Sequence, residues 1–110
     1  MLVIPVQAVP SQTLQTTVGG QDCTLNIYQL DQYGLFMDVL VNGDVICQGI
    51  ICENANLIVR YAYLGFIGDF AWFDTYAGVT ETQPSNPVYT GIGAQYVLMY
   101  LDPSDVSALS

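Results

Sequence analysis

A hairpin signal at Asn42-Gly43 constrains the fold more than any other feature of this chain. Asn-Gly is the preferred dipeptide of a two-residue type I′ turn, because both residues adopt positive φ there. Residues 35–41, which precede it, alternate between two faces with the period of a β-strand. The apolar run 45–52 follows, and Gly49 within it predicts a bulge or a close backbone approach. The sequence therefore predicts two antiparallel strands joined at this dipeptide.

Two earlier segments extend the same pattern. Residues 11–18 and 23–30 also alternate, and the Gly19-Gly20 dipeptide between them accepts positive φ without steric cost. A second turn is predicted at residues 31–34, which end in glycine. The first half of the chain therefore predicts a four-stranded meander over residues 11–52.

The second half of the chain is less regular. Residues 53–67 predict an extended, partly irregular crossover, and residues 69–75 predict a strand. Glycine and proline punctuate residues 76–93, which predicts a long loop before a final strand over residues 94–101. Residues 102–110 are expected to form a loose tail.

These segments predict an all-β fold, a small antiparallel β-barrel or β-sandwich of about six to eight short strands. The length of 110 residues fits a single domain, with its core over about residues 4–101. No repeat at a fixed period, low-complexity segment or interior linker is found in the sequence.

The charge balance excludes several classes of function. Ten acidic residues stand against one arginine, with no lysine or histidine, so the formal net charge is -9. Sequence-specific nucleic-acid binders and polybasic membrane-surface binders need a basic patch that this chain lacks. Apolar residues make up 52 % of the chain, and so few charges on its surface indicate that another protein covers part of it. A monomer coated with glutamine, asparagine, threonine and serine is the alternative.

The residues present do not predict an enzyme. Catalysis by a histidine base or a lysine nucleophile is excluded, and no general base accompanies the serines and cysteines. Asp69 and Asp74 are five positions apart in one predicted strand, so they point to opposite faces and suit neither acid–base work nor a metal site. The sequence predicts no metal site and no cofactor, and solvated carboxylates are the expected state of the acidic residues in turns.

Cysteine usage and the N-terminus bear on the compartment. Cys23, Cys47 and Cys52 are an odd number without a C-x-x-C pair, which predicts small buried hydrophobic residues rather than disulfides or a zinc site. The apolar start lacks a positive region and is cut by proline and glutamine, so no signal peptide is predicted, and no stretch predicts a membrane helix. Synthesis in a reducing cytoplasm is expected.

The candidate binding residues are the single arginine and an aromatic run that is too large for one face of a small core. Arg60 is predicted either to pair with a carboxylate of a partner protein or to form an internal ion pair with an acidic residue. Its candidate internal partners are Glu53, Asp69 and Asp74. Tyrosine and tryptophan are enriched at protein interfaces. The predicted interface residues are Arg60, Tyr61, Tyr63, Phe66, Trp72, Tyr76 and Tyr89.

Several segments resemble the small baseplate plug family of contractile-tailed bacteriophages. The most specific is the run Arg-Tyr-Ala-Tyr-Leu-Gly-Phe-Ile-Gly-Asp over residues 60–69. The other matching segments are Ile4-Pro5-Val6, Val9-Pro10-Ser11-Gln12, Asp74-Thr75, Tyr89-Thr90-Gly91-Ile92-Gly93 and Tyr96-Val97-Leu98-Met99-Tyr100. The resemblance spans about residues 4–101, and the chain departs from it in lacking basic residues at positions 27–30.

The resemblance implies a structural, non-enzymatic virion protein that forms a plug or ring at the central hub of the tail baseplate. The implied partners are hub, tail-tube or spike proteins and further copies of the chain around the tail axis, with synthesis in the host cytoplasm and no membrane insertion. The alternative is a small β-barrel module of a different class, which would recognise a peptide or a sugar through the aromatic residues between positions 61 and 76.

Overall fold

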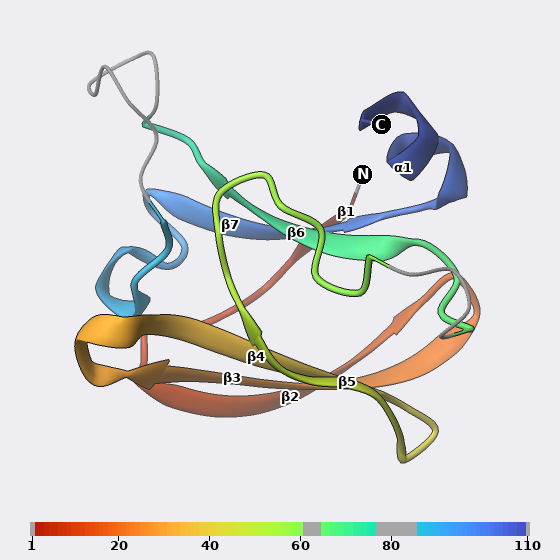
Figure 1. The fold of residues 1–110 in the computed structure, drawn as a ribbon, viewed down its shortest axis with the longest axis horizontal. Helices are drawn as coiled ribbons and strands as arrows, with labels where there is room; N and C mark the ends of the chain where they lie inside the picture. Colours follow the sequence, from red (N-terminus) through yellow and green to blue (C-terminus); the bar gives the residue numbers. More distant parts are fainter. Residues whose placement is uncertain (1, 61–64, 77–85, 110) are drawn as a thin grey trace.

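The computed structural model describes residues 2–60, 65–76 and 86–109 and confirms the all-β class (Figure 1). Within these ranges, the strands are β1 (Leu2–Ile4), β2 (Ser11–Val18), β3 (Gln21–Leu30), β4 (Gly34–Val41), β5 (Asp44–Ile51), β6 (Asp69–Asp74) and β7 (Tyr96–Leu101). The other elements are the 3-10 turns η1 (Asp31–Tyr33) and η3 (Tyr89–Gly91) and the helix α1 (Pro103–Leu109).

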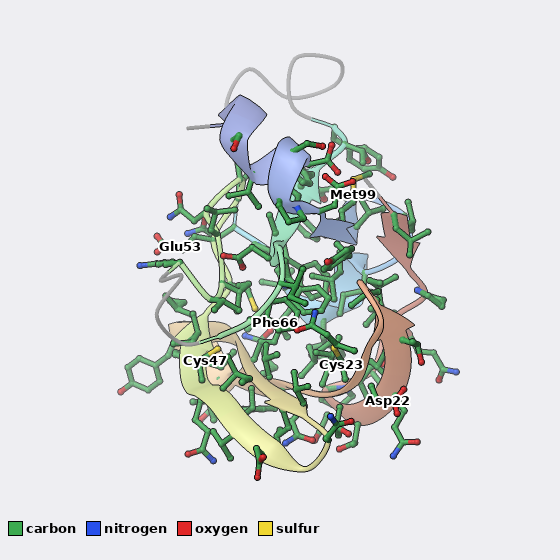
Figure 2. The ribbon with its side chains drawn as sticks, turned by 90° about the vertical axis from the view of Figure 1, so that its right-hand side faces the viewer. Asp22, Cys23, Cys47, Glu53, Phe66 and Met99 are labelled. Carbon is green, nitrogen blue, oxygen red and sulfur yellow. The ribbon has the colours of Figure 1, made fainter. Side chains whose placement is uncertain are left out.

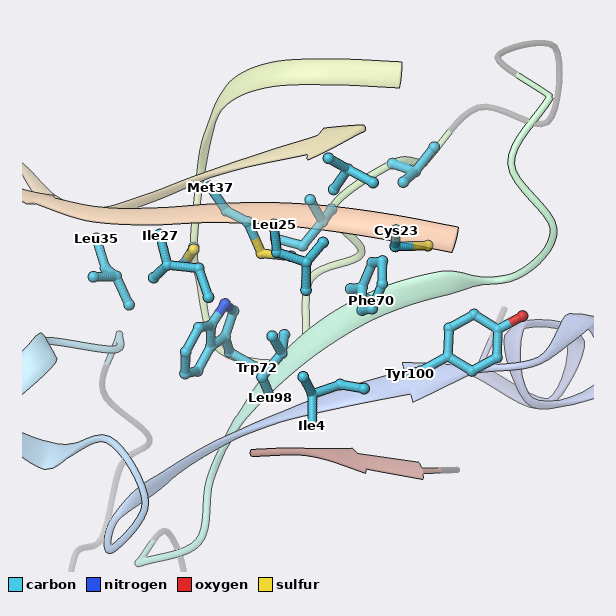
Figure 3. Close-up of a cluster of buried hydrophobic side chains, with 14 of the residues drawn as sticks. Ile4, Cys23, Leu25, Ile27, Leu35, Met37, Phe70, Trp72, Leu98 and Tyr100 are labelled. Carbon is cyan, nitrogen blue, oxygen red and sulfur yellow. The ribbon is translucent and has the colours of Figure 1, made fainter. Parts of the chain in front are cut away.

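The strands form two antiparallel sheets, in the orders β2-β3-β4-β5 and β1-β7-β6. Figure 1 shows the sheets as two facing layers, and Figure 3 shows the side chains packed between them. Leu25 and Met37 project from the larger sheet, Phe70 and Leu98 from the smaller, and none is more than 1 % exposed. No strand pairing among the described residues closes the sheets into one barrel, so the sandwich alternative fits.

The predicted meander is confirmed as the larger sheet. Asn42 and Gly43 have φ values of 51° and 86°, the two positive angles that a type I′ turn requires. Gly49 lies at a bulge, because β5 has one more residue than β4 between the pairs Met37–Ile50 and Val39–Cys47. Its φ is 64°, as the sequence position suggested.

The crossover after β5 is extended and irregular, as predicted, over its described residues. Ala55 donates its backbone N–H to the carbonyl of Trp72 at 2.7 Å, and Ile58 donates to the carbonyl of Phe70 at 2.9 Å. These bonds hold the segment against the edge of β6 that does not pair with β7. Residues 61–64 of the crossover and residues 77–85 of the predicted loop lie outside the described residues.

The C-terminus differs from the predicted loose tail, because residues 103–109 form α1. Asp102 caps the helix: its Oδ1 accepts the backbone N–H of Asp105 at 2.9 Å and the hydroxyl of Ser104 at 2.7 Å. Asp105 returns the contact, since its Oδ2 accepts the backbone N–H of Asp102 at 3.3 Å. Pro103 fills the first helical position, where no N–H is needed. These contacts organise a helix too short to show a periodic pattern.

The cysteines are free thiols. Cys23 and Cys52 are buried and Cys47 is partly buried, as expected of small hydrophobic residues. Burial raises the pKa of Cys47 to about 11 and that of Cys52 to about 12, so both remain protonated near neutral pH. None of the helices in the described ranges has the length and apolar character needed to cross a membrane.

Candidate protein-interaction site

The site is built around the buried carboxylate of Asp69, the first residue of β6. Only 3 % of Asp69 is exposed. Its Oδ1 accepts the backbone N–H groups of Ile58, Val59 and Phe70, at 3.0, 2.7 and 2.6 Å. Its Oδ2 accepts the backbone N–H of Arg60 at 2.7 Å. A buried carboxylate needs such donors in place of water, so Asp69 fixes residues 58–60 against the start of β6.

Arg60 follows this anchor and is exposed. Its backbone has a φ of 72°, which is uncommon for a residue with a side chain. The guanidinium donates its Nε–H to the carbonyl of Leu57 at 2.7 Å. In the described part of the chain, Arg60 forms no ion pair with Glu53, Asp69 or Asp74, and Asp69 binds its backbone instead. The guanidinium therefore lies at the surface without an internal carboxylate partner among these residues.

The segment that leads back into β6 is held by both sheets. Gln21 of β3 brackets Ile67: its Oε1 accepts the Ile67 N–H at 3.0 Å, and its Nε2 donates to the Ile67 carbonyl at 3.1 Å. The hydroxyl of Tyr100 in β7 donates to the same carbonyl at 2.6 Å. Gly68 has a φ of 88°, and a Cβ there would collide with the Leu101 carbonyl. Only glycine fits at this position.

The side chain of Phe66 faces the core, whereas that of Ile67 faces the surface. Phe66 is 7 % exposed and packs on Phe70 at 5.4 Å and on Tyr100 at 6.3 Å between ring centroids. Ile67 is 49 % exposed. The clamps from Gln21 and Tyr100 therefore present an isoleucine at the surface while a phenylalanine holds the segment to the core.

A cavity of about 370 Å³ lies between this segment and α1. In Figure 2, α1 lies above Phe66. The residues that line the cavity come from both segments. Most of its lining is apolar, and its polar members are Arg60 and the fully bonded Asp69. The lining residues are Val59, Arg60, Phe66, Ile67, Gly68, Asp69, Pro103 and Val106. The site thus combines an apolar hollow with one exposed cation.

The structure brings together only two of the described candidate residues, Arg60 and Phe66. Trp72 is 0 % exposed in the core, where it cannot contact a partner protein, so we omit it from the interface. Tyr76 is 39 % exposed just beyond the other end of β6, and Tyr89 is partly buried in η3. The sequence could not separate these positions, because an aromatic run does not show which members face the core. Tyr61 and Tyr63 lie outside the described residues.

Sequence reasoning missed the residues that complete the site. Gln21 reaches Ile67 across 46 positions, and no local pattern predicts that contact. The contribution of α1, through Pro103 and Val106, could have been found from the capping sequence Asp-Pro-Ser-Asp that begins at Asp102.

The two acidic residues of β6 are buried and hydrogen-bonded. Asp74 is 8 % exposed, and its Oδ1 accepts the Tyr76 N–H at 3.0 Å and the Gln95 side-chain amide at 3.1 Å. Among the described residues, no three histidine, cysteine, aspartate or glutamate side chains lie close enough together to hold a metal ion.

Comparison with known proteins places the chain in a family. A family model described as "Cyanophage baseplate Pam3 plug gp18" matches residues 1–103, which include all of the strands and the first residue of α1. No curated protein matches the chain. The resemblance seen in residues 60–69 is thereby confirmed over nearly the whole length. The chain belongs to this family of baseplate plug proteins and is a structural component of a phage tail.

Proposed function

We propose that the protein is a non-enzymatic subunit of a contractile-tail baseplate, where it forms a plug or ring at the central hub against the end of the tail tube. The family supports the baseplate role. The surface supports burial against other proteins, because a single cation accompanies ten acids and several large apolar side chains are exposed. Those side chains belong to Leu2, Val3, Leu30, Tyr33, Val45, Ile67, Tyr76 and Val88.

Arg60 is the observation that carries the proposal. Its guanidinium is exposed beside an apolar cavity and has no internal carboxylate partner among the described residues. An arginine can bind a carboxylate through two parallel hydrogen bonds, and such arginines are frequent interface hot spots. The expected contact is a hub or tail-tube segment that places an apolar side chain in the cavity and a carboxylate on Arg60. Tyr61 and Tyr63, next in sequence, belong to the same proposed interface.

The experiment measures binding of the purified protein to the hub and tail-tube proteins of the same phage. Arg60→Glu should weaken the complex by about 10-fold to 100-fold, which is typical of an arginine hot spot. Arg60→Lys should retain part of the affinity, since it keeps the charge but loses the planar fork. Gln48→Ala, on the exposed part of β5, is the matched control and should bind as the wild type does. Equal binding by Arg60→Glu and the wild type would contradict the proposal.

The alternative module for peptides or sugars would have to bind through aromatic residues other than Phe70 and Trp72, such as the exposed Tyr76. A stacking platform needs exposed aromatic rings, whereas Phe70 and Trp72 are both 0 % exposed and form part of the core.

A further inference from the structure

Three of the four sheet edges are short, irregular or covered, and β2 is the exception. The outer edge of β6 is paired with residues 54–57 through isolated bridges. The edge strand β5 is interrupted by two register shifts opposite β4, and bulges of this kind protect sheet edges from pairing. β1 has only three residues. β2, by contrast, pairs with β3 over all eight of its residues without a shift.

The register between β2 and β3 determines which backbone groups of β2 face away from β3. The N–H of Gln29 donates to the carbonyl of Pro10 at 2.8 Å, which makes these two residues a hydrogen-bonded pair. Alternation along the antiparallel ladder then turns the N–H and C=O groups of Ser11, Thr13, Gln15 and Thr17 away from β3. No described residue pairs with this side of β2, and all four side chains are exposed.

This edge is also free of charge. Residues 2–21 contain no charged side chain, although the chain carries a net charge of -9. β2 contains no lysine and no proline, the residues that commonly block an exposed edge. Two copies of an acidic protein repel each other over most of their surfaces, but the central part of this edge lets them meet with the nearby carboxylates at its two ends.

We propose that β2 pairs antiparallel with β2 of a second copy about a two-fold axis, which joins two four-stranded sheets into one. This surface is separate from the Arg60 site and does not depend on the proposed function. One register uses all of the outward groups, with Ser11 opposite Thr17 of the second copy and Thr13 opposite Gln15 of the second copy.

The same register places Leu14 on the two-fold axis. Leu14 is partly buried on the inner face of β2, against the core. Across the axis it would meet Leu14 of the second copy in a pair without backbone hydrogen bonds, where opposed side chains lie closest. The acids around this edge lie at the two ends of β2. Asp22 lies opposite Thr17, Asp102 and Asp105 share a surface pocket with Thr17, and Asp31 shares one with Pro10. The two-fold axis therefore sends the two Asp22 carboxylates to opposite ends of the joint. The register therefore places an apolar contact at the centre of the joint and leaves the acids at its two ends.

Sedimentation equilibrium of two matched double variants tests this pairing. T13E/Q15E sets carboxylates opposite carboxylates and should raise the dimer dissociation constant by about tenfold or more. T13K/Q15E changes the same two positions but sets opposite charges against each other, so it should dimerise at least as tightly as the wild type at low salt. Both variants lose the Thr13–Asn26 hydrogen bond, so its loss cannot explain a difference between them.

Amide hydrogen exchange of the wild type gives a second readout. The amides of Thr13 and Gln15 should become protected as concentration rises, whereas those of Leu14 and Thr16, which face β3, should be protected at every concentration. A wild type that stays monomeric up to about 1 mM would overturn the proposal. Equal dimerisation of the two variants, or a dimer in which Thr13 and Gln15 exchange freely, would also overturn it.

Discussion

At the scale of single residues, Asp69 explains why the most family-specific segment ends in an aspartate. Its carboxylate replaces water for four backbone N–H groups, three of them just before the start of residues 61–64. A short polar side chain with two oxygens meets that demand, and a glutamate would place its oxygens one carbon too far from the backbone. The residue that the sequence offered as an ion-pair partner of Arg60 instead binds backbone N–H groups, including that of Arg60.

Asp69→Ala should lower the free energy of unfolding by about 2 to 4 kcal/mol, because it leaves buried N–H donors without an acceptor. Asp69→Asn keeps one carbonyl oxygen and should cost less. Urea unfolding followed by tryptophan fluorescence measures both, since Trp72 is in the core. Asp44→Ala, in the exposed hairpin, is the control and should change stability little. A loss of less than about 1 kcal/mol in Asp69→Ala would show that the anchor is dispensable.

At the scale of elements, the sequence could predict the strands whose pattern and turns depend on residues close together in the chain. The strands of the larger sheet follow from period-two alternation and from turn residues at Gly19-Gly20 and Asn42-Gly43, all of which act over a few positions. The interaction site could not be predicted in the same way. It depends on Gln21 and Tyr100 meeting Ile67, contacts of long sequence separation that only the packing of the two sheets creates.

The helix α1 was not predicted, although its capping sequence could have revealed it. Its N-cap gives a prediction at the scale of this element. Asp102→Ala should destabilise the helix by about 1 kcal/mol, the usual cost of losing an N-cap side chain. The amide of Val106 donates to the Asp102 carbonyl at 3.0 Å, so its hydrogen exchange reports fraying directly. Exchange at Val106 should accelerate while exchange in the core strand β3 stays unchanged. Gln48→Ala, on the exposed part of β5, is a control that leaves the cap intact, and equal exchange of Val106 in both variants would contradict a capping role for Asp102.

At the scale of the whole molecule, the acidic residues that produce the net charge of -9 are divided between the core and the surface. Asp38, Asp69 and Asp74 are buried and accept hydrogen bonds from backbone or side-chain donors. The other carboxylates in the described part of the chain repel one another, and Arg60 is the single cation of the sequence. Such a protein has little attraction between surface charges for salt to screen, so screening acts mainly on repulsion.

The melting temperature should therefore rise when NaCl is increased from about 20 mM to about 500 mM, a range in which the screening length falls to a few ångströms. The triple variant D22N/D31N/D44N removes three exposed carboxylates and should show a smaller rise. Asparagine suits these sites: it can still accept the Thr17 hydroxyl at position 22, and it tolerates the φ of 43° at position 31. Scanning calorimetry at low protein concentration separates this effect from self-association. A melting temperature that falls with salt would mean that attractive ion pairs dominate the surface, and the case for a face reserved for protein partners would lose its electrostatic basis.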